Sequence, residues 1–133
     1  MITPEQEALI KKNPDTTLPP GQGKKVYIAG PFTKGVVEQN VRNAVNAGDR
    51  MLSAGLVPYV PHLNWLWGFA HAHSWQQWLS LDLEWLDECD CLLRLPGESA
   101  GADLEVEYAK RKGIPVFYNE GRLLEWAFNG GVV

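Results

Sequence analysis

The sequence predicts a three-layer α/β fold built on a parallel sheet of four or five strands. Short β-favouring runs alternate with stretches of helical periodicity after residue 25. Strands that alternate with helices form parallel sheets, because right-handed crossovers place the helices on both faces. The expected strand order is about 2-1-3-4, as in Rossmann-like and flavodoxin-like sheets, with the switch point between strands 1 and 3. A chain of 133 residues suits one such domain and is too short for two.

The first 24 residues are expected to form an arm, and residues 25–133 the domain. Thr3-Pro4-Glu5-Gln6 predicts a short capped helix, and proline and glycine breaks follow up to residue 21. Within the domain, the four β-favouring runs are 26–29, 56–60, 91–95 and 114–118. The helical stretches are 36–54, 75 to about 89, 102–112 and 121–128. In the second of these, the apolar residues are spaced as a buried helix face, which is expected to contain Trp75, Trp78, Leu79, Leu83 and Leu86.

The predicted topology brings three connections to one edge of the sheet. They are the turn after the first strand at residues 30–32, a long tryptophan-rich loop over 61–73, and the turn at 97–101. Long loops are often functional, and open α/β sheets bind ligands at the carboxyl ends of their strands. The functional site is therefore expected at this edge.

Composition and charge exclude several classes of function. A formal net charge of -4 and an isoelectric point near 5.3 argue against a nucleic-acid polymer as partner, which would need a basic face. No apolar run approaches a membrane span, and the N-terminus lacks the apolar stretch of a secretion signal, so a cytoplasmic protein without a membrane partner is expected. Cys89 and Cys91 are too close for an ordinary disulfide and are interpreted as buried thiols.

The turn at residues 99–105 carries the strongest chemical signal. It is expected to place Glu105 in the first turn of a helix, at the predicted site. Helix N-termini present unpaired N–H groups and a partial positive charge, so an anion can rest there beside the carboxylate. One anionic group and one nucleophile can therefore share this turn.

Three segments carry a family resemblance. Residues 27–31 (YIAGP), 82–90 (DLEWLDECD) and 99–109 (SAGADLEVEYA) resemble the signatures of the nucleoside 2-deoxyribosyltransferase superfamily, in the same chain order. The resemblance runs from about Val26 to Tyr118. Within the superfamily the chain is most similar to the 2'-deoxynucleoside 5'-monophosphate N-hydrolases, which share the serine six positions before the glutamate. That branch hydrolyses the N-glycosidic bond to a free base and deoxyribose 5-phosphate.

The resemblance implies a role for each matching residue. Glu105 is the expected nucleophile, Asp82 the acid–base carboxylate, and Tyr27, taken to lie at the end of the first strand, the phenol that orients Glu105. It also implies a nucleotide or nucleoside as ligand, no metal or organic cofactor, and a homodimer or higher homo-oligomer. The residues expected to bind the substrate are Gly30, Pro31, Phe32, His62, Trp65, Ser99, Gly101, Ala102 and, from a neighbouring subunit, Asn129. Trp67 and Phe69 are further candidates for stacking on the base.

The chemistry agrees with these roles. Glycosidic cleavage passes through an oxocarbenium-like transition state, which a carboxylate traps covalently while a second carboxyl group protonates the leaving base. Serine at position 99 favours a monophosphate, because the transferases tend to carry an aspartate there, and a hydroxyl donates to phosphate whereas aspartate repels it. Asp103 argues the other way, because its charge weakens anion binding.

Other interpretations of the same residues stay open. Glu105 is also suited to complement the helix dipole, Ser99 to cap the helix, Asp82 to a solvated helix face and Tyr27 to the core. Arg94 is suited to phosphate binding or to covering the sheet edge. His62, His71 and His73 with Asp82 suggest a metal site, although their spacing matches no metal motif. At the level of function, the alternatives are deoxyribosyl transfer between bases and a non-catalytic nucleotide-binding module.

Overall fold

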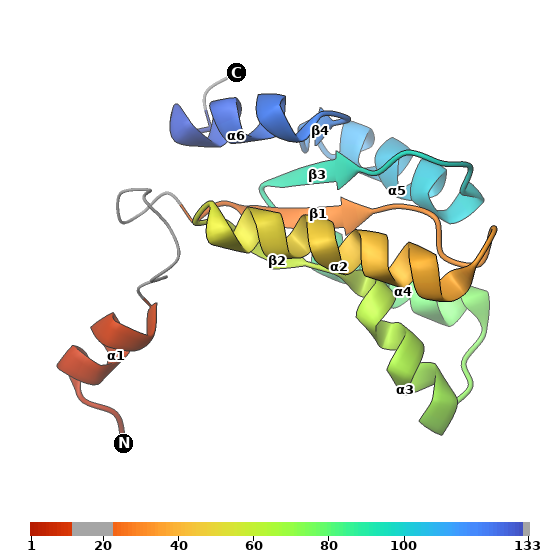
Figure 1. Cartoon of the computed structure of the whole chain (residues 1–133), viewed down its shortest axis with the longest axis horizontal. Helices are drawn as coiled ribbons and strands as arrows, with labels where there is room; N and C mark the ends of the chain where they lie inside the picture. Colours follow the sequence, from red (N-terminus) through yellow and green to blue (C-terminus); the bar gives the residue numbers. More distant parts are fainter. Residues whose placement is uncertain (12–22, 132–133) are drawn as a thin grey trace.

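The computed structural model describes residues 1–11 and 23–131 and has the predicted α/β architecture (Figure 1). The proline and glycine breaks expected in the arm lie outside these residues. The strands are β1 (Lys25–Ala29), β2 (Val57–Tyr59), β3 (Cys91–Arg94) and β4 (Val116–Phe117). The helices are α1 (Pro4–Lys11), α2 (Val37–Ser53), the 3-10 turn η1 (Pro61–Leu63), α3 (Asn64–Ala70), α4 (Trp75–Leu86), α5 (Ala100–Arg111) and α6 (Glu120–Phe128).

The four described strands form one parallel sheet in the order β2-β1-β3-β4, so the predicted order is confirmed. In the register, Tyr27 lies beside Tyr59 on one side and beside Leu92 on the other. Because β1 and β3 are the two central strands, their carboxyl ends lie next to each other at the switch point. The loops that follow them therefore meet.

Side chains of the central strands alternate between two cores. Val26 and Ile28 of β1 face α2 and α6, whereas Tyr27 and Ala29 face α4 and α5. The first core contains Val26, Ile28, Ala44, Ala47, Met51, Leu56, Cys91, Leu93, Leu123 and Ala127. The second contains Tyr27, Ala29, Leu86, Leu92, Ala102, Val106 and Ala109. Helices thus cover both faces of the sheet, as the crossover rule requires.

Several details of the sequence prediction are wrong. Residues 61–73 are not a long loop: η1 and α3 occupy most of them. Helix α5 begins at Ala100, two residues earlier than expected, so Glu105 lies in its second turn and not in its first. Tyr27 lies in the middle of β1, and Trp75, expected on a buried helix face, is 61% exposed. For Trp75, apolar spacing predicted burial that the tertiary packing does not provide.

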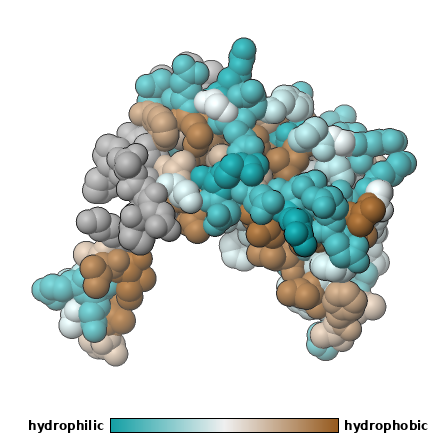
Figure 2. Space-filling model, in the orientation of Figure 1, coloured by the Kyte–Doolittle hydropathy of each residue, from teal (hydrophilic) through white to brown (hydrophobic). Residues whose placement is uncertain are grey.

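The N-terminal helix forms as predicted and is capped. The Thr3 hydroxyl accepts a hydrogen bond from the Gln6 backbone, and the Gln6 side chain accepts one from the Thr3 backbone. None of the residues of α1 is buried. Apolar side chains also gather over α3, at the lower right of Figure 2, where Leu66 and Phe69 are strongly exposed. None of the helices described in the chain is long and apolar enough to cross a membrane.

Candidate active site

A cavity of about 470 Å³ opens at the carboxyl edge of the sheet. Its walls come from the turn after β1, from η1 and α3, from one side of α4, and from the beginning of α5. The lining residues are Gly30, Phe32, Thr33, Pro61, His62, Asn64, Trp65, Gly68, Phe69, Trp75, Trp78, Leu79, Asp82, Ser99, Gly101, Ala102 and Glu105. Its size is typical of a pocket for a small organic ligand.

Glu105 interrupts the apolar face of α5 that packs on the sheet. The buried residues of this helix are Ala102, Glu105, Val106 and Ala109, which recur at the i, i+3, i+4, i+7 spacing of a helix face. An apolar residue is the usual occupant of such a position, yet Glu105 is a carboxylic acid that is only 6% exposed. The Tyr27 hydroxyl, from the neighbouring strand, donates a hydrogen bond to its Oε2 atom. The predicted contact between these two residues is confirmed.

The environment of Glu105 raises its pKa, so that its carboxyl group is largely protonated at neutral pH. Burial raises its pKa to about 8, the Tyr27 hydrogen bond and the Arg94 charge lower it, and the Asp82 charge raises it. Burial also raises the Tyr27 pKa well above its ordinary value, so the phenol stays protonated and acts as a donor. When Glu105 is ionised, its carboxylate therefore accepts a hydrogen bond from the Tyr27 hydroxyl, which stays protonated.

Asp82 supplies a second carboxyl group to the same cavity. It lies on α4, where burial raises its pKa to about 7. Its Oδ1 atom is buried without a hydrogen-bond partner among the described residues. Because the charge of Asp82 raises the pKa of Glu105, and burial raises the pKa of both groups, the pair retains one proton more easily than none. One acid and one carboxylate thus coexist in the cavity near neutral pH.

Aromatic rings form a layer with Tyr27, the residue that donates to Glu105. Tyr59 of β2 packs against Tyr27 with ring centroids 5.6 Å apart, and Trp85 stacks on Tyr59 at the same distance. The Asn64 amide lies 3.4 Å from the Tyr59 hydroxyl. This layer fixes the ring of Tyr27 and was not predicted from the sequence, because its members come from three separate elements.

The cavity wall over α3 and α4 is largely aromatic. Trp65 and Phe69 lie against each other with centroids 5.4 Å apart, as two of the predicted stacking residues. Trp75 and Trp78 also line the cavity and were expected in the core instead. Trp67 does not line it, because its ring packs edge-on against Trp78, 5.2 Å away. Helical structure in α3 decides which tryptophans face the cavity.

The turns after β1 and β3 are locked together. The Nε2–H of His62, in η1, donates to the Pro31 carbonyl at 3.0 Å, and burial lowers the pKa of His62, so the imidazole is neutral. The Pro31 ring in turn packs against Gly97, where an added Cβ would lie 2.7 Å from its Cγ. Pro31 therefore joins the turns that border the cavity and does not line the cavity itself.

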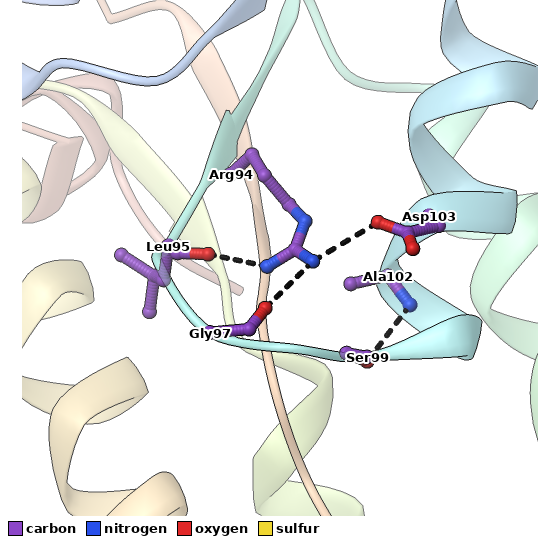
Figure 3. Close-up of polar contacts among 6 residues, drawn as sticks. All are labelled: Arg94, Leu95, Gly97, Ser99, Ala102 and Asp103. Carbon is purple, nitrogen blue, oxygen red and sulfur yellow. Dashed lines mark hydrogen bonds and ion pairs between the residues drawn. The ribbon is translucent and has the colours of Figure 1, made fainter.

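The beginning of α5 has its cap and its charges already paired. The Ser99 hydroxyl accepts the Ala102 N–H at 3.1 Å, which confirms the capping interpretation. Arg94 pairs with Asp103 at 3.0 Å and donates to the carbonyls of Leu95 and Gly97 (Figure 3). Arg94 does not line the cavity, and no Lys or Arg appears among its described lining residues.

Two further sequence expectations concern residues away from this cavity. Asn129 lies in a separate hollow beside β4, with Arg122 and Trp126, and its role in a neighbouring subunit stays a prediction. Cys91 is buried as expected, whereas Cys89 is partly exposed. Within residues 1–11 and 23–131, no group of three or more His, Cys, Asp or Glu side chains is placed to hold a metal ion. The histidine metal site considered from the sequence is therefore not formed there.

Comparison with known proteins places this site in a family. The family model described as a domain of unknown function (DUF4406) matches residues 24–118. The chain belongs to the DUF4406 family. The DUF4406 match contains the whole sheet and every residue that lines the cavity, whereas Asn129 lies outside it. A search of curated proteins found no significant match.

Proposed function

We propose that this DUF4406 protein is an N-glycosidase that hydrolyses a (deoxy)nucleoside 5'-monophosphate to a free base and a sugar 5-phosphate. One observation carries the proposal. Glu105 lies on a buried helix face, at a position where an apolar residue is usual. It accepts a hydrogen bond from Tyr27 and shares its cavity with the carboxyl group of Asp82. Burying two carboxyl groups together destabilises a fold, so their presence calls for a chemical role.

In the first step, the Glu105 carboxylate attacks the anomeric carbon of the sugar. The C–N bond to the base breaks, and protonated Asp82 gives its proton to the leaving base. The result is a sugar ester on Glu105, a free base and an ionised Asp82. Tyr27 keeps the attacking carboxylate in one orientation through its hydrogen bond.

In the second step, water replaces the base. The Asp82 carboxylate takes a proton from this water, whose oxygen attacks the anomeric carbon and displaces Glu105. Asp82 is then protonated and Glu105 ionised, as at the start. The reacting state is the one with its proton on Asp82. Because the pKa of Glu105, about 8, lies above that of Asp82, about 7, this state is the smaller fraction of the singly protonated pair near neutral pH.

The remaining walls of the cavity suit the two ends of such a substrate. Trp65, Phe69 and Trp75 offer flat apolar faces for a nucleobase. At the other end, the hydroxyl of Ser99 and the N-terminus of α5 at Gly101 offer donors and a positive dipole to a phosphate. Ser99 accepts one hydrogen bond in its cap, and its own O–H proton is available in addition.

A second candidate is deoxyribosyl transfer between bases of neutral nucleosides. It is favoured by the lining of the cavity, whose described residues include two carboxyl groups and no Lys or Arg. A dianionic phosphate meets no formal positive charge there, whereas a neutral sugar needs none. The same covalent intermediate serves both reactions, because a second base takes the place of water.

The decisive experiment is a screen for base release. The full chain is incubated with the common deoxynucleoside and ribonucleoside monophosphates and the matching free nucleosides, and released base is separated by chromatography. The expected result is base release from at least one monophosphate, and none with Glu105→Gln. Base exchange in the presence of a competing base favours the transferase instead. Tight binding without base release, for every compound, contradicts both and favours a binding module.

A further inference from the structure

Arg94 is a buried cation next to the site, and its hydrogen bonds go to other groups of the same chain. It is the last residue of β3, and 9% of it is exposed. Its guanidinium donates to the carbonyl of Leu95, to the carbonyl of Gly97 at 2.9 Å and to Asp103 Oδ1 at 3.0 Å. Figure 3 shows this side chain lying inside the turn between β3 and α5, with its acceptors around it.

The turn that Arg94 fills forms part of the cavity's support. The carbonyls of Leu95 and Gly97 belong to no helix or strand, and the Arg94 guanidinium supplies a donor to each of them. Gly97 has a φ of +116°, a conformation that suits glycine, and it packs closely on Pro31. Arg94 therefore fixes the turn that precedes Ser99 and, through Gly97, holds it against the turn after β1.

The pairing also removes a charge from the beginning of α5. Asp103 lies in the first turn of this helix, one residue after Ala102, which lines the cavity. Its carboxylate, 71% exposed, would otherwise stand unpaired beside the helix N-terminus. The bidentate geometry of arginine allows one side chain to hold two carbonyls and a carboxylate, which a lysine ammonium does not reproduce.

We propose that Arg94 is a positioning residue for the site at Glu105: it fixes the β3–α5 turn and cancels the charge of Asp103, so that α5 presents its N-terminus and Glu105 to the cavity in one arrangement. The Arg94 charge also lowers the pKa of Glu105, against the effects of burial and of Asp82. The groups that act on Glu105 are thus Tyr27 from β1, Asp82 from α4 and Arg94 from β3. The link to turnover rests on the proposed function, whereas the link to Glu105 does not.

The test is a double-mutant cycle on the full chain with Arg94→Met, Asp103→Asn and the double variant. Lys34→Met is the matched control, because Lys34 is an exposed cation paired with Glu98 of the same turn at 3.4 Å. Two quantities are measured: the titration of the Glu105 carboxyl group by ¹³C NMR, which needs no turnover, and kcat and KM for base release.

We expect Arg94→Met to raise the pKa of Glu105 and to lower kcat/KM by about tenfold or more, because a misplaced turn displaces the reacting groups. The double variant regains part of both, since no unpaired Asp103 remains, and Lys34→Met matches the wild type. Arg94→Lys keeps the charge and loses the planar guanidinium that reaches several acceptors at once. We therefore expect an almost normal Glu105 titration with a raised KM.

Two results overturn the proposal. One is an Arg94→Met protein whose Glu105 titration and kcat/KM equal those of the wild type. The other is a double variant identical to Arg94→Met, which shows that Asp103 is not coupled to Arg94. If Arg94→Met does not fold, Arg94→Gln with and without Asp103→Asn completes the same cycle, because glutamine also removes the charge. If the wild type releases no base, the proposed function fails, and the Glu105 titration across the cycle still decides the role of Arg94.

Discussion

The two faces of the sheet are built from the same strands and have opposite characters. On the α2 and α6 face, Val26 and Ile28 of β1 pack into a core made entirely of apolar residues and Cys91. On the α4 and α5 face, Tyr27 of the same strand points at Glu105, and a cavity reaches the sheet edge beside them. The first face stabilises the fold, whereas the second gives up stability to bury titratable groups.

This division teaches where chemistry is tolerated in a small domain. The net stability of a domain is only about 5–15 kcal/mol, so the cost of burying polar groups on one face has to be offset by apolar packing on the other. Substitutions on the α2 and α6 face should therefore lower stability and leave turnover unchanged. Substitutions at Glu105 and Tyr27 should lower turnover. The predictions below follow from this contrast.

The largest expected effect is that of Glu105→Gln on turnover. The amide keeps the shape and accepts the Tyr27 hydrogen bond but is not a nucleophile, so we expect kcat to fall by about 10³-fold or more. Measured by base release and by thermal unfolding at pH 8, the variant should be inactive and at least as stable as the wild type. An active variant would show that Glu105 is not the nucleophile.

On the α2 and α6 face, Met51→Ala should act on stability instead. Met51 is fully buried in the apolar core, and such truncations destabilise by about 2–5 kcal/mol because a cavity remains. Chemical denaturation should show this loss, while kcat of the folded fraction stays at the wild-type value. A large change in kcat at full folding would mean that the two faces are coupled.

Tyr27→Phe tests the polar face without removing a carboxyl group. The hydrogen bond from Tyr27 lowers the pKa of Glu105, so its loss raises that pKa and leaves less carboxylate at pH 7. We expect kcat/KM to fall by about 10-fold to 100-fold at pH 7 and by less at pH 9. A pH–rate profile compares the two proteins, and a loss equal at both pH values would argue for a packing role alone.

The smallest expected effect is on the pH dependence of stability. The pKa values of Asp82 and Glu105 rise from ordinary values of 3.8 and 4.5 to about 7 and about 8 on folding. Their contribution to the free energy of unfolding is complete below pH 4 and is lost as pH rises through 7 and 8.

Thermal unfolding should therefore show the wild type becoming less stable between pH 5 and pH 8, by about 1 kcal/mol or more. Asp82→Asn and Glu105→Gln should each flatten this slope, because an amide does not titrate. Met51→Ala should leave the slope unchanged while lowering the whole curve. A wild-type stability that does not fall over this range would show that the two carboxyl groups ionise as freely as in water.

Much of the fold followed from local pattern, and part of the site from the family resemblance. β-Favouring runs and helical periodicity are set by neighbouring residues, so the four strands and their order were predicted correctly. The family resemblance predicted the contact between Glu105 and Tyr27, and Glu105 also stands out as the acid on an otherwise small and apolar helix face.

The errors arose where long-range packing decides. The segment 61–73 has too few polar residues to signal a helix boundary, so its sequence predicts a loop where α3 forms. Trp75 and Trp78 have the spacing of a buried face, and only the positions of α3 and α5 turn that face toward a cavity. For Arg94, the sequence offered two roles, and the turn that folds around its side chain supplied a third.

The sequence by itself determined the order of strands and helices, because each element is encoded by the period of its own apolar residues. It also determined which carboxyl groups fall near the carboxyl edge of the sheet. Tertiary structure alone decided which of them are buried, what they touch and how their pKa values shift. Burial depends on elements far apart in the chain, as Tyr27, Asp82 and Glu105 show, and no local pattern records the distance between them.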